Sequence, residues 1–192
     1  MLNPVGFSIK EHLQNFVIVS VFYITAYSLT LGFVAPLQQM LFSNVITELS
    51  LLFLPHGVRV LVVYFFGWRG VLYLIPSAYL MKILSSQAGI PLDPWSPLFN
   101  IIACYVGFQL VKFALPERFS GAQLPKWRDF GLVALCGSIF NSAGMTLLHQ
   151  NELDLFIALG YVIGDMAGFF VCFFILIYAF RFARLLAKVD DA

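Results

Sequence analysis

The sequence predicts an all-α, polytopic integral membrane protein with six transmembrane helices and both termini in the cytoplasm. The first observation behind this fold class is composition, since the 192-residue chain is 60% hydrophobic and only 11% charged. This charged fraction is about half that of a typical soluble chain, so much of the surface must contact lipid. The second is a set of six apolar stretches close to the ~20 residues that a spanning helix needs. The third is the concentration of basic residues at alternate connectors.

The predicted spans are separated by connectors that contain turn residues. Ala35-Pro36 follows the first span, Gly67-Trp68-Arg69-Gly70 follows the second, and a proline-rich run at 89–97 follows the third. No stretch remains for a soluble domain, so residues 1–192 are expected to form one helical-bundle domain. The six spans are expected near 14–37, 44–67, 70–88, 97–115, 129–149 and 155–184.

Lysine and arginine residues decide the predicted orientation. The connectors near 38–43, 85–96 and 150–154 contain neither residue type. By the positive-inside rule the opposite side, which includes both termini, faces the cytoplasm, and the expected location is the bacterial inner membrane. The basic residues on that side are Lys10, Arg69, Lys112, Arg118, Lys126, Arg128, Arg181, Arg184 and Lys188.

Several function classes are excluded or not expected. A net charge of +1 provides no basic field for nucleic acid, so no such partner is expected. Cys104, Cys136 and Cys172 are isolated within apolar stretches and are interpreted as packing residues. The chain contains no G-x-S-x-G elbow, no H-E-x-x-H zinc motif and no glycine-rich phosphate loop. We therefore expect no enzyme activity, no catalytic residue, no metal and no cofactor.

Ionisable side chains within a span are costly unless they are paired or hydrated, so they mark candidate sites. In the second span, Pro55 is expected to kink the helix near the membrane middle and to free the carbonyl of Leu51. An opened turn beside His56 and Arg59 would form a ligand-binding site. The stripe of this span that should face protein contains Glu48, Leu52, Pro55, Arg59 and Val63, with His56 beside it.

The sixth span contains glycines at four-residue spacing, at Gly160, Gly164 and Gly168. Such a ladder forms a groove into which a neighbouring helix packs closely. The fifth span offers small residues at the same spacing, at Ala134, Ser138 and Ser142. We therefore expect the fifth and sixth spans to be close neighbours.

Asp165 is the only strong acid expected at mid-depth in the membrane. Counting a rise of about 1.5 Å per residue from the outer boundary places it at a level similar to Arg59. We expect these two residues to pair, with His56 and Asn141 around them. Nearer the outer surface, Glu48 and Lys82 form a second possible pair.

Other interpretations of these residues stay open. A bridge between Arg59 and Asp165 could hold two helices in register without binding a ligand. His56 could contact a pigment or a quinone, although a bis-histidine haem site is not expected because His56 is the only histidine at mid-span.

Short motifs in three spans point to a family. The sequence SLLFLPHGVR occupies 50–59, FGWRGV occupies 66–71, Pro76 follows, and GDMAG occupies 164–168. In this order they resemble the bacterial membrane-associated sensor domain of MASE type, whose members have about eight spans and feed a cytoplasmic output domain. The resemblance implies a sensory core that contains Pro55, Gly57, Gly164 and Asp165. It also implies a stand-alone, shortened sensor without its own output domain.

We therefore expect a sensor-like membrane module that binds a small hydrophobic or anionic ligand, or a partner membrane protein, at the mid-membrane polar residues around the expected Arg59–Asp165 pair. Besides lipid, a partner protein is expected because no output domain follows. One alternative is an accessory structural subunit that packs through its glycine ladder against a larger membrane complex. Another is the substrate-binding component of a small-molecule transporter, since six spans in about 190 residues also describe those of energy-coupling vitamin transporters.

Overall fold

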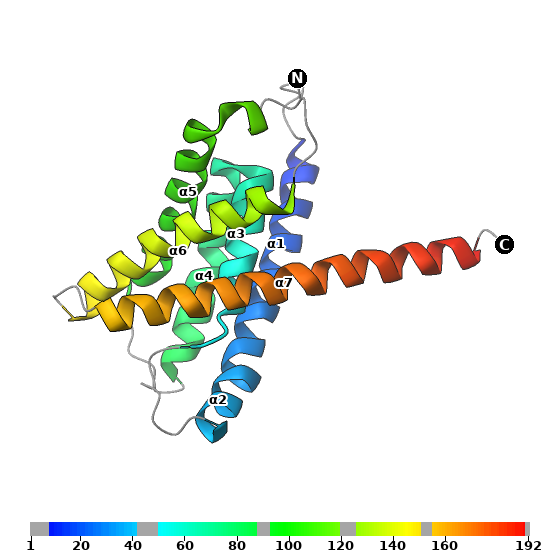
Figure 1. Ribbon diagram of the computed structural model, residues 1–192. Coiled ribbons are helices and arrows are strands. Elements are labelled where there is room, and N and C mark those ends of the chain that lie inside the picture. Colours follow the sequence, from blue (N-terminus) through cyan, green and yellow to red (C-terminus); the bar gives the residue numbers. More distant parts are fainter. Residues whose placement is uncertain (1–7, 42–49, 88–92, 120–125, 151–154, 191–192) are drawn as a thin grey trace.

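The computed structural model describes residues 8–41, 50–87, 93–119, 126–150 and 155–190, and within these ranges the regular secondary structure is entirely helical (Figure 1). The all-α prediction is therefore confirmed for the described residues. The elements are α1 (Ile9–Leu29), the π-helix η1 (Thr30–Val34), α2 (Ala35–Leu41), α3 (Leu54–Phe66), α4 (Trp68–Gln87), α5 (Ser96–Ala114), the 3-10 helix η2 (Pro116–Phe119), α6 (Trp127–Gln150) and α7 (Leu155–Asp190).

Four helices in the described part of the chain are long and apolar enough to cross a membrane. They are Ile9–Leu41, Ser96–Ala114, Trp127–Leu148 and Leu155–Phe182. These four correspond to the first, fourth, fifth and sixth predicted spans. The other two predicted spans differ, because α3 has only 13 residues and the 20-residue α4 is less apolar.

The first spanning helix continues past the point where a turn was predicted. Ala35-Pro36 does not end it, since α1, η1 and α2 run without interruption from Ile9 to Leu41. Inside an α-helix, Pro36 would lack an N–H to donate and its ring would clash with the carbonyl four residues back. A π-turn before Pro36 relieves this clash. The N–H of Ala35 bonds the carbonyl of Thr30, five residues back, and the α-helix then resumes with Pro36 in its first turn.

Helix α3 lies at the centre of the bundle. It contacts α1, α4, α5, α6 and α7, and every residue from Leu54 to Val63 is buried. A helix that is apolar on nearly all sides is expected to be surrounded in this way. Its C-terminus ends at Gly67, whose φ of 57° only glycine adopts readily, so the predicted turn between the second and third spans is confirmed there.

The second predicted span begins later than expected. A helix was predicted from residue 44, but Ser50–Phe53 is not helical and α3 starts at Leu54. Pro55 therefore lies in the first turn of a helix, where its missing N–H removes no hydrogen bond. The predicted kink at Pro55 is wrong, since the residue begins a helix rather than bending one.

Small residues set the closest helix contacts. A Cβ on Gly107 of α5 would lie 2.5 Å from the backbone nitrogen of Gly137 of α6, so the two backbones meet directly. Gly144 of α6 faces the ring of Phe99 in the same way. Cys104 packs against Gly137, and all three cysteines are free, as their interpretation as packing residues implies.

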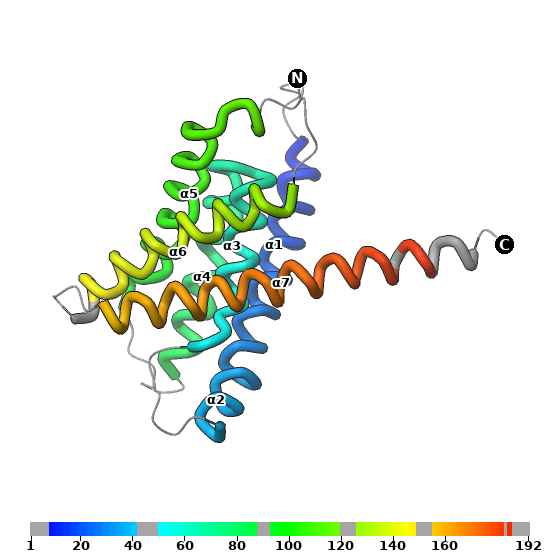
Figure 2. The backbone as a smooth tube through the Cα atoms, in the orientation of Figure 1, coloured from blue at the N-terminus to red at the C-terminus, as the bar shows by residue number. Residues whose placement is uncertain are grey.

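Helices α6 and α7 contact each other, which confirms the predicted neighbourhood of the fifth and sixth spans. Figures 1 and 2 show α7 continuing well beyond the bundle toward the C-terminus. Its 36 residues correspond to about 54 Å, which exceeds the ~30 Å of a bilayer core. The distal part of α7 exposes apolar side chains, including Phe174, Ile175, Tyr178, Phe180, Phe182 and Leu185.

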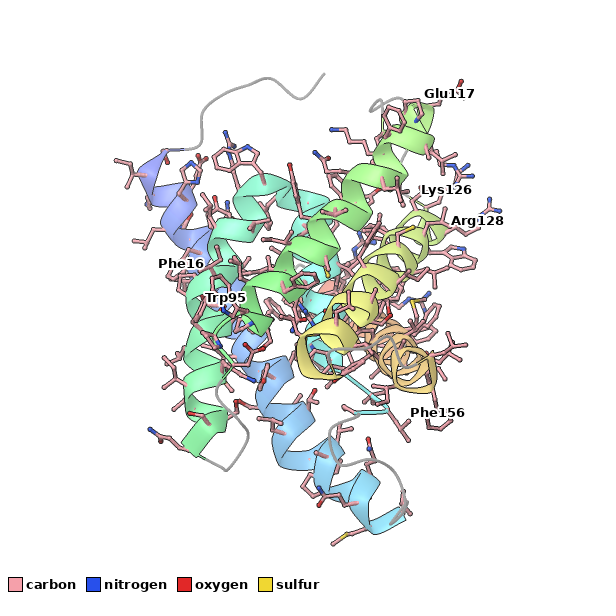
Figure 3. The ribbon with its side chains drawn as sticks, turned by 90° about the vertical axis from the view of Figure 1, so that its left-hand side faces the viewer. Phe16, Trp95, Glu117, Lys126, Arg128 and Phe156 are labelled. Carbon is pink, nitrogen blue, oxygen red and sulfur yellow. The ribbon has the colours of Figure 1, made fainter. Side chains whose placement is uncertain are left out.

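Charged residues around the η2 turn mark one end of the bundle. Figure 3 shows Glu117, Lys126 and Arg128 there. Asp129 is buried at the start of α6, where its carboxylate accepts hydrogen bonds from Arg118 Nη1 at 2.8 Å and from the Lys126 N–H at 3.0 Å. This carboxylate satisfies an N–H at the helix N-terminus.

Candidate functional site

The non-helical segment Ser50–Phe53 introduces the residues of the candidate site. Irregular backbone inside a membrane protein is tolerated only where its polar groups are bonded within the protein or line a cavity. Here three backbone N–H groups donate to other elements: Leu51 to Gln38 Oε1 at 2.7 Å, Phe53 to the Gly164 carbonyl at 2.9 Å and Leu54 to Thr30 Oγ1 at 3.3 Å. The segment is therefore held between α7 and the first helix.

Two glycines of the α7 glycine ladder pack directly against this segment. A Cβ on Gly164 would overlap the carbonyl oxygen of Ser50, and one on Gly168 would overlap that of Phe53. These two glycines thus face the chain that leads into α3, not the small residues of α6 as predicted, while Gly160 is only partly buried. The expectation failed because a non-helical segment can bring its backbone closer than a helix, whose side chains keep its axis 8–10 Å away.

Gly57 extends the same contact along α3. A Cβ there would lie 2.6 Å from the Cβ of Cys172 and 3.1 Å from the Cα of Phe169, both on α7. Helices α3 and α7 therefore touch through glycines contributed by each of them. Any side chain larger than hydrogen at these positions would push α7 away from α3.

His56 is the central residue of the polar site and is fully buried. Its Nε2 lies 3.1 Å from the carbonyl oxygen of Ala134 on α6. Its Nδ1 lies 3.3 Å from Asp165 Oδ2 on α7 and 3.8 Å from Cys104 Sγ on α5. One imidazole therefore contacts polar groups from three surrounding helices.

Asp165 completes the connection between α6 and α7. Its Oδ2 accepts a hydrogen bond of 2.7 Å from Asn141 Nδ2, and the two residues are 2% and 3% exposed. Asp165 follows Gly164 by one residue, which turns its side chain by about 100° from the glycine face toward α6. The structure therefore brings His56, Asn141 and Asp165 together from three different helices, and we call these three residues the polar centre.

Arg59 does not form the predicted ion pair with Asp165. Both residues are buried, but the contact within 4 Å of Asp165 is made by His56. Residues three apart on a helix point about 60° away from each other, and similar depth alone does not decide which one meets an acid on a neighbouring helix.

The Arg59 guanidinium has different surroundings. Its Nε–H donates to the Pro55 carbonyl at 3.4 Å, and its Cζ lies 5.2 Å from the centre of the Phe53 ring. Among the described residues, Nη1 and Nη2 are buried and have no hydrogen-bond partner. Two strong donors of a permanently charged group are thus unsatisfied.

The contacts of His56 link the helices around the polar centre. Nε2 faces the Ala134 carbonyl, and Nδ1 faces both Asp165 Oδ2 and Cys104 Sγ. A neutral imidazole with its proton on Nε2 can therefore donate to Ala134 while Nδ1 accepts from the Cys104 thiol. Among the described residues no carboxylate lies within 4 Å of the Arg59 guanidinium.

The remaining predicted site residues have different outcomes. Glu48, and with it the predicted pair with Lys82, lies outside the described residues. Pro55 and Gly57 are buried on α3. Among the residues that the structure describes, no three His, Cys, Asp or Glu side chains are placed to hold a metal ion.

Sequence reasoning missed the residues that hold the segment before α3. Thr30 and Gln38 bond its backbone, but nothing in the sequence distinguishes them from other polar residues near a span end. The same region forms an apolar groove of about 390 Å³, lined by residues of η1 and α2 such as Phe33 and Leu37, and by Leu51 and Leu52.

Comparison of the chain with protein-family models, curated proteins and solved structures finds no match. The MASE-type resemblance therefore depends on the short motifs alone. The residues in which that resemblance places a sensory core lie on α3 and α7, which contact each other. They are Pro55 and Gly57 on α3 and Gly164 and Asp165 on α7.

Proposed function

We propose that this protein is a sensor-like membrane module that binds a small ligand beside the polar centre. The observation that carries this proposal is the meeting of His56, Asn141 and Asp165 from three helices, next to the unsatisfied guanidinium of Arg59. Buried polar groups are costly and seldom improve stability over apolar packing, so their presence favours a role in binding.

Helix α7 is the proposed route from the ligand to an output. It carries Asp165 in the bundle and extends far beyond it (Figure 1). A ligand that alters the contact between Asp165 and His56 would change how α7 sits on α3. A partner membrane protein in contact with the distal part of α7 would then receive the signal.

The proposed topology keeps six crossings, both termini in the cytoplasm and a bacterial inner-membrane location. For the second crossing, the 13 residues of α3 rise about 20 Å at about 1.5 Å each, and the non-helical residues 50–53 add to this length. A bilayer core is ~30 Å thick, so the proposed crossing includes this non-helical segment. The 20 residues of α4 span about 30 Å, which suffices for the third crossing.

The experiment that tests this function is gentle detergent extraction followed by native mass spectrometry. We expect the wild-type protein to retain a small molecule and Asp165→Asn to lose at least ~90% of it, a change of about 1.4 kcal/mol or more in binding. The matched control is Glu117→Gln, the same acid-to-amide change at an exposed position on η2, which should leave retention unchanged.

Two results would contradict the proposal. One is a wild-type protein that carries no small molecule in any mild detergent tested. The other is equal retention by the wild type, Asp165→Asn and Arg59→Gln, since the polar centre and its neighbour would then be irrelevant to binding.

A further inference from the structure

We propose that Arg59 is an anion-binding residue, and that the ligand of this module presents a single negative charge to its Nη1 and Nη2 groups. The ligand class is a small monovalent anion or the carboxylate end of an organic molecule. This inference rests on the proposed function and specifies which chemistry the bound molecule offers.

The first argument is the state of the guanidinium. Arg59 is 0% exposed, and among the described residues its two terminal nitrogens have no hydrogen-bond partner. Nε is the nitrogen that bonds the protein, through the Pro55 carbonyl. Arginine remains charged in proteins, so a buried guanidinium with free N–H groups needs an acceptor.

The second argument is charge balance. Arg59 carries a permanent positive charge. Among the described residues no carboxylate lies within 4 Å of its guanidinium, since Asp165 makes its contact with His56. One monovalent anion at Nη1 and Nη2 would supply a negative charge in direct contact with the guanidinium.

The third argument is the direction in which the N–H bonds of the Arg59 guanidinium point. The Phe53 ring lies over the guanidinium with its centre 5.2 Å from Cζ, so an aromatic side chain occupies the cation–π position. The free N–H bonds of Nη1 and Nη2 point along the guanidinium plane, where a carboxylate binds in the two-point geometry that arginine favours. Phe53 belongs to the non-helical segment that Gly164 holds, so the ligand would lie next to the α3–α7 contact.

The test measures the thermal unfolding midpoint of the full-length protein in non-ionic detergent at constant ionic strength. Sodium sulfate is the reference salt, and sodium chloride or sodium formate replaces it stepwise. We expect the midpoint to rise in a saturable manner, by about 5–10 °C when the anion exceeds its Kd a hundredfold. A midpoint that does not depend on the identity of the anion would overturn the proposal.

Variants of Arg59 assign the effect to this residue. In Arg59→Gln the shift should vanish, whereas an undiminished shift would show that the anion binds elsewhere. If Arg59→Gln does not fold, Arg59→Lys is used instead to test whether the anion binds at this residue. Lysine keeps the charge but not the two-point geometry, so a chloride shift should persist while any additional shift from formate is lost. If neither chloride nor formate raises the unfolding midpoint of the wild type or of Arg59→Lys, the proposal is overturned.

A carboxylate series separates the two sources of the anion. Equal shifts with chloride, formate and acetate indicate a small inorganic anion, and a shift that grows through butyrate and hexanoate indicates an organic acid. Both results support the site. If no anion shifts the midpoint but a neutral molecule co-purifies and is lost in Asp165→Asn, this inference fails while the proposed function stands.

Discussion

Replacing Gly164 by alanine is expected to destabilise the protein by about 3–5 kcal/mol, although it adds a single methyl group. The new Cβ would overlap the backbone carbonyl of Ser50, which cannot rotate away as a side chain would. Helix α7 must then shift, and the hydrogen bond from the Phe53 N–H to the Gly164 carbonyl is weakened or lost. The measurement is the free energy of unfolding in mixed micelles, followed by circular dichroism.

Gly131→Ala is the matched control for this substitution. Gly131 also lies in a spanning helix, but no atom lies within 4 Å of an added Cβ. In an open helical position alanine should stabilise by up to ~1 kcal/mol. Equal effects of the two substitutions would show that α7 does not rest on the segment before α3.

The second large effect is expected from Asp165→Leu, at about 3–5 kcal/mol of lost stability. Leucine has no acceptor for Asn141 Nδ2, which the carboxylate bonds at 2.7 Å, and it removes the partner of His56 Nδ1. Removing one member of a buried pair is more harmful than replacing both, because a polar group is left alone in an apolar interior. The unfolding assay described for Gly164→Ala measures this loss.

Asp165→Asn is the comparison variant, because asparagine has nearly the same shape as aspartate but carries no charge. Its amide oxygen can still accept from Asn141, so it should lose less stability than Asp165→Leu. If both variants are as stable as the wild type, the carboxylate contributes nothing to the fold and the observed contacts do not hold α6 and α7 together.

Much of the fold was predictable because composition and the length of apolar spans are averages over many residues, which single contacts hardly change. The four apolar helices and the contact between α6 and α7 follow from such averages. The start of α3 did not follow, because a proline in an apolar run fits both a kinked helix and a first helical turn. Pro55 takes the second role, and the non-helical residues before it are fixed by Thr30 and Gln38 from distant sequence.

The candidate site was predictable as a set of residues but not as a set of contacts. Rarity alone singled out His56, Asn141 and Asp165, since few polar groups occur within the spans. Which cation meets Asp165 depends on the direction of each side chain around α3, and a difference of about 60° decides between His56 and Arg59. The partner of the glycine ladder depends likewise on where the chain is not helical, which residue spacing does not reveal.

A pair of double-mutant cycles tests the central claim, which is that Asp165 is paired with His56 and not with Arg59. The variants are Asp165→Asn, His56→Gln and Arg59→Gln, alone and combined, and the quantity is the interaction free energy obtained from unfolding. We predict an interaction of about 1.5–3 kcal/mol between His56 and Asp165 and a smaller one between Arg59 and Asp165. A larger interaction for Arg59 than for His56 would contradict this account of the site.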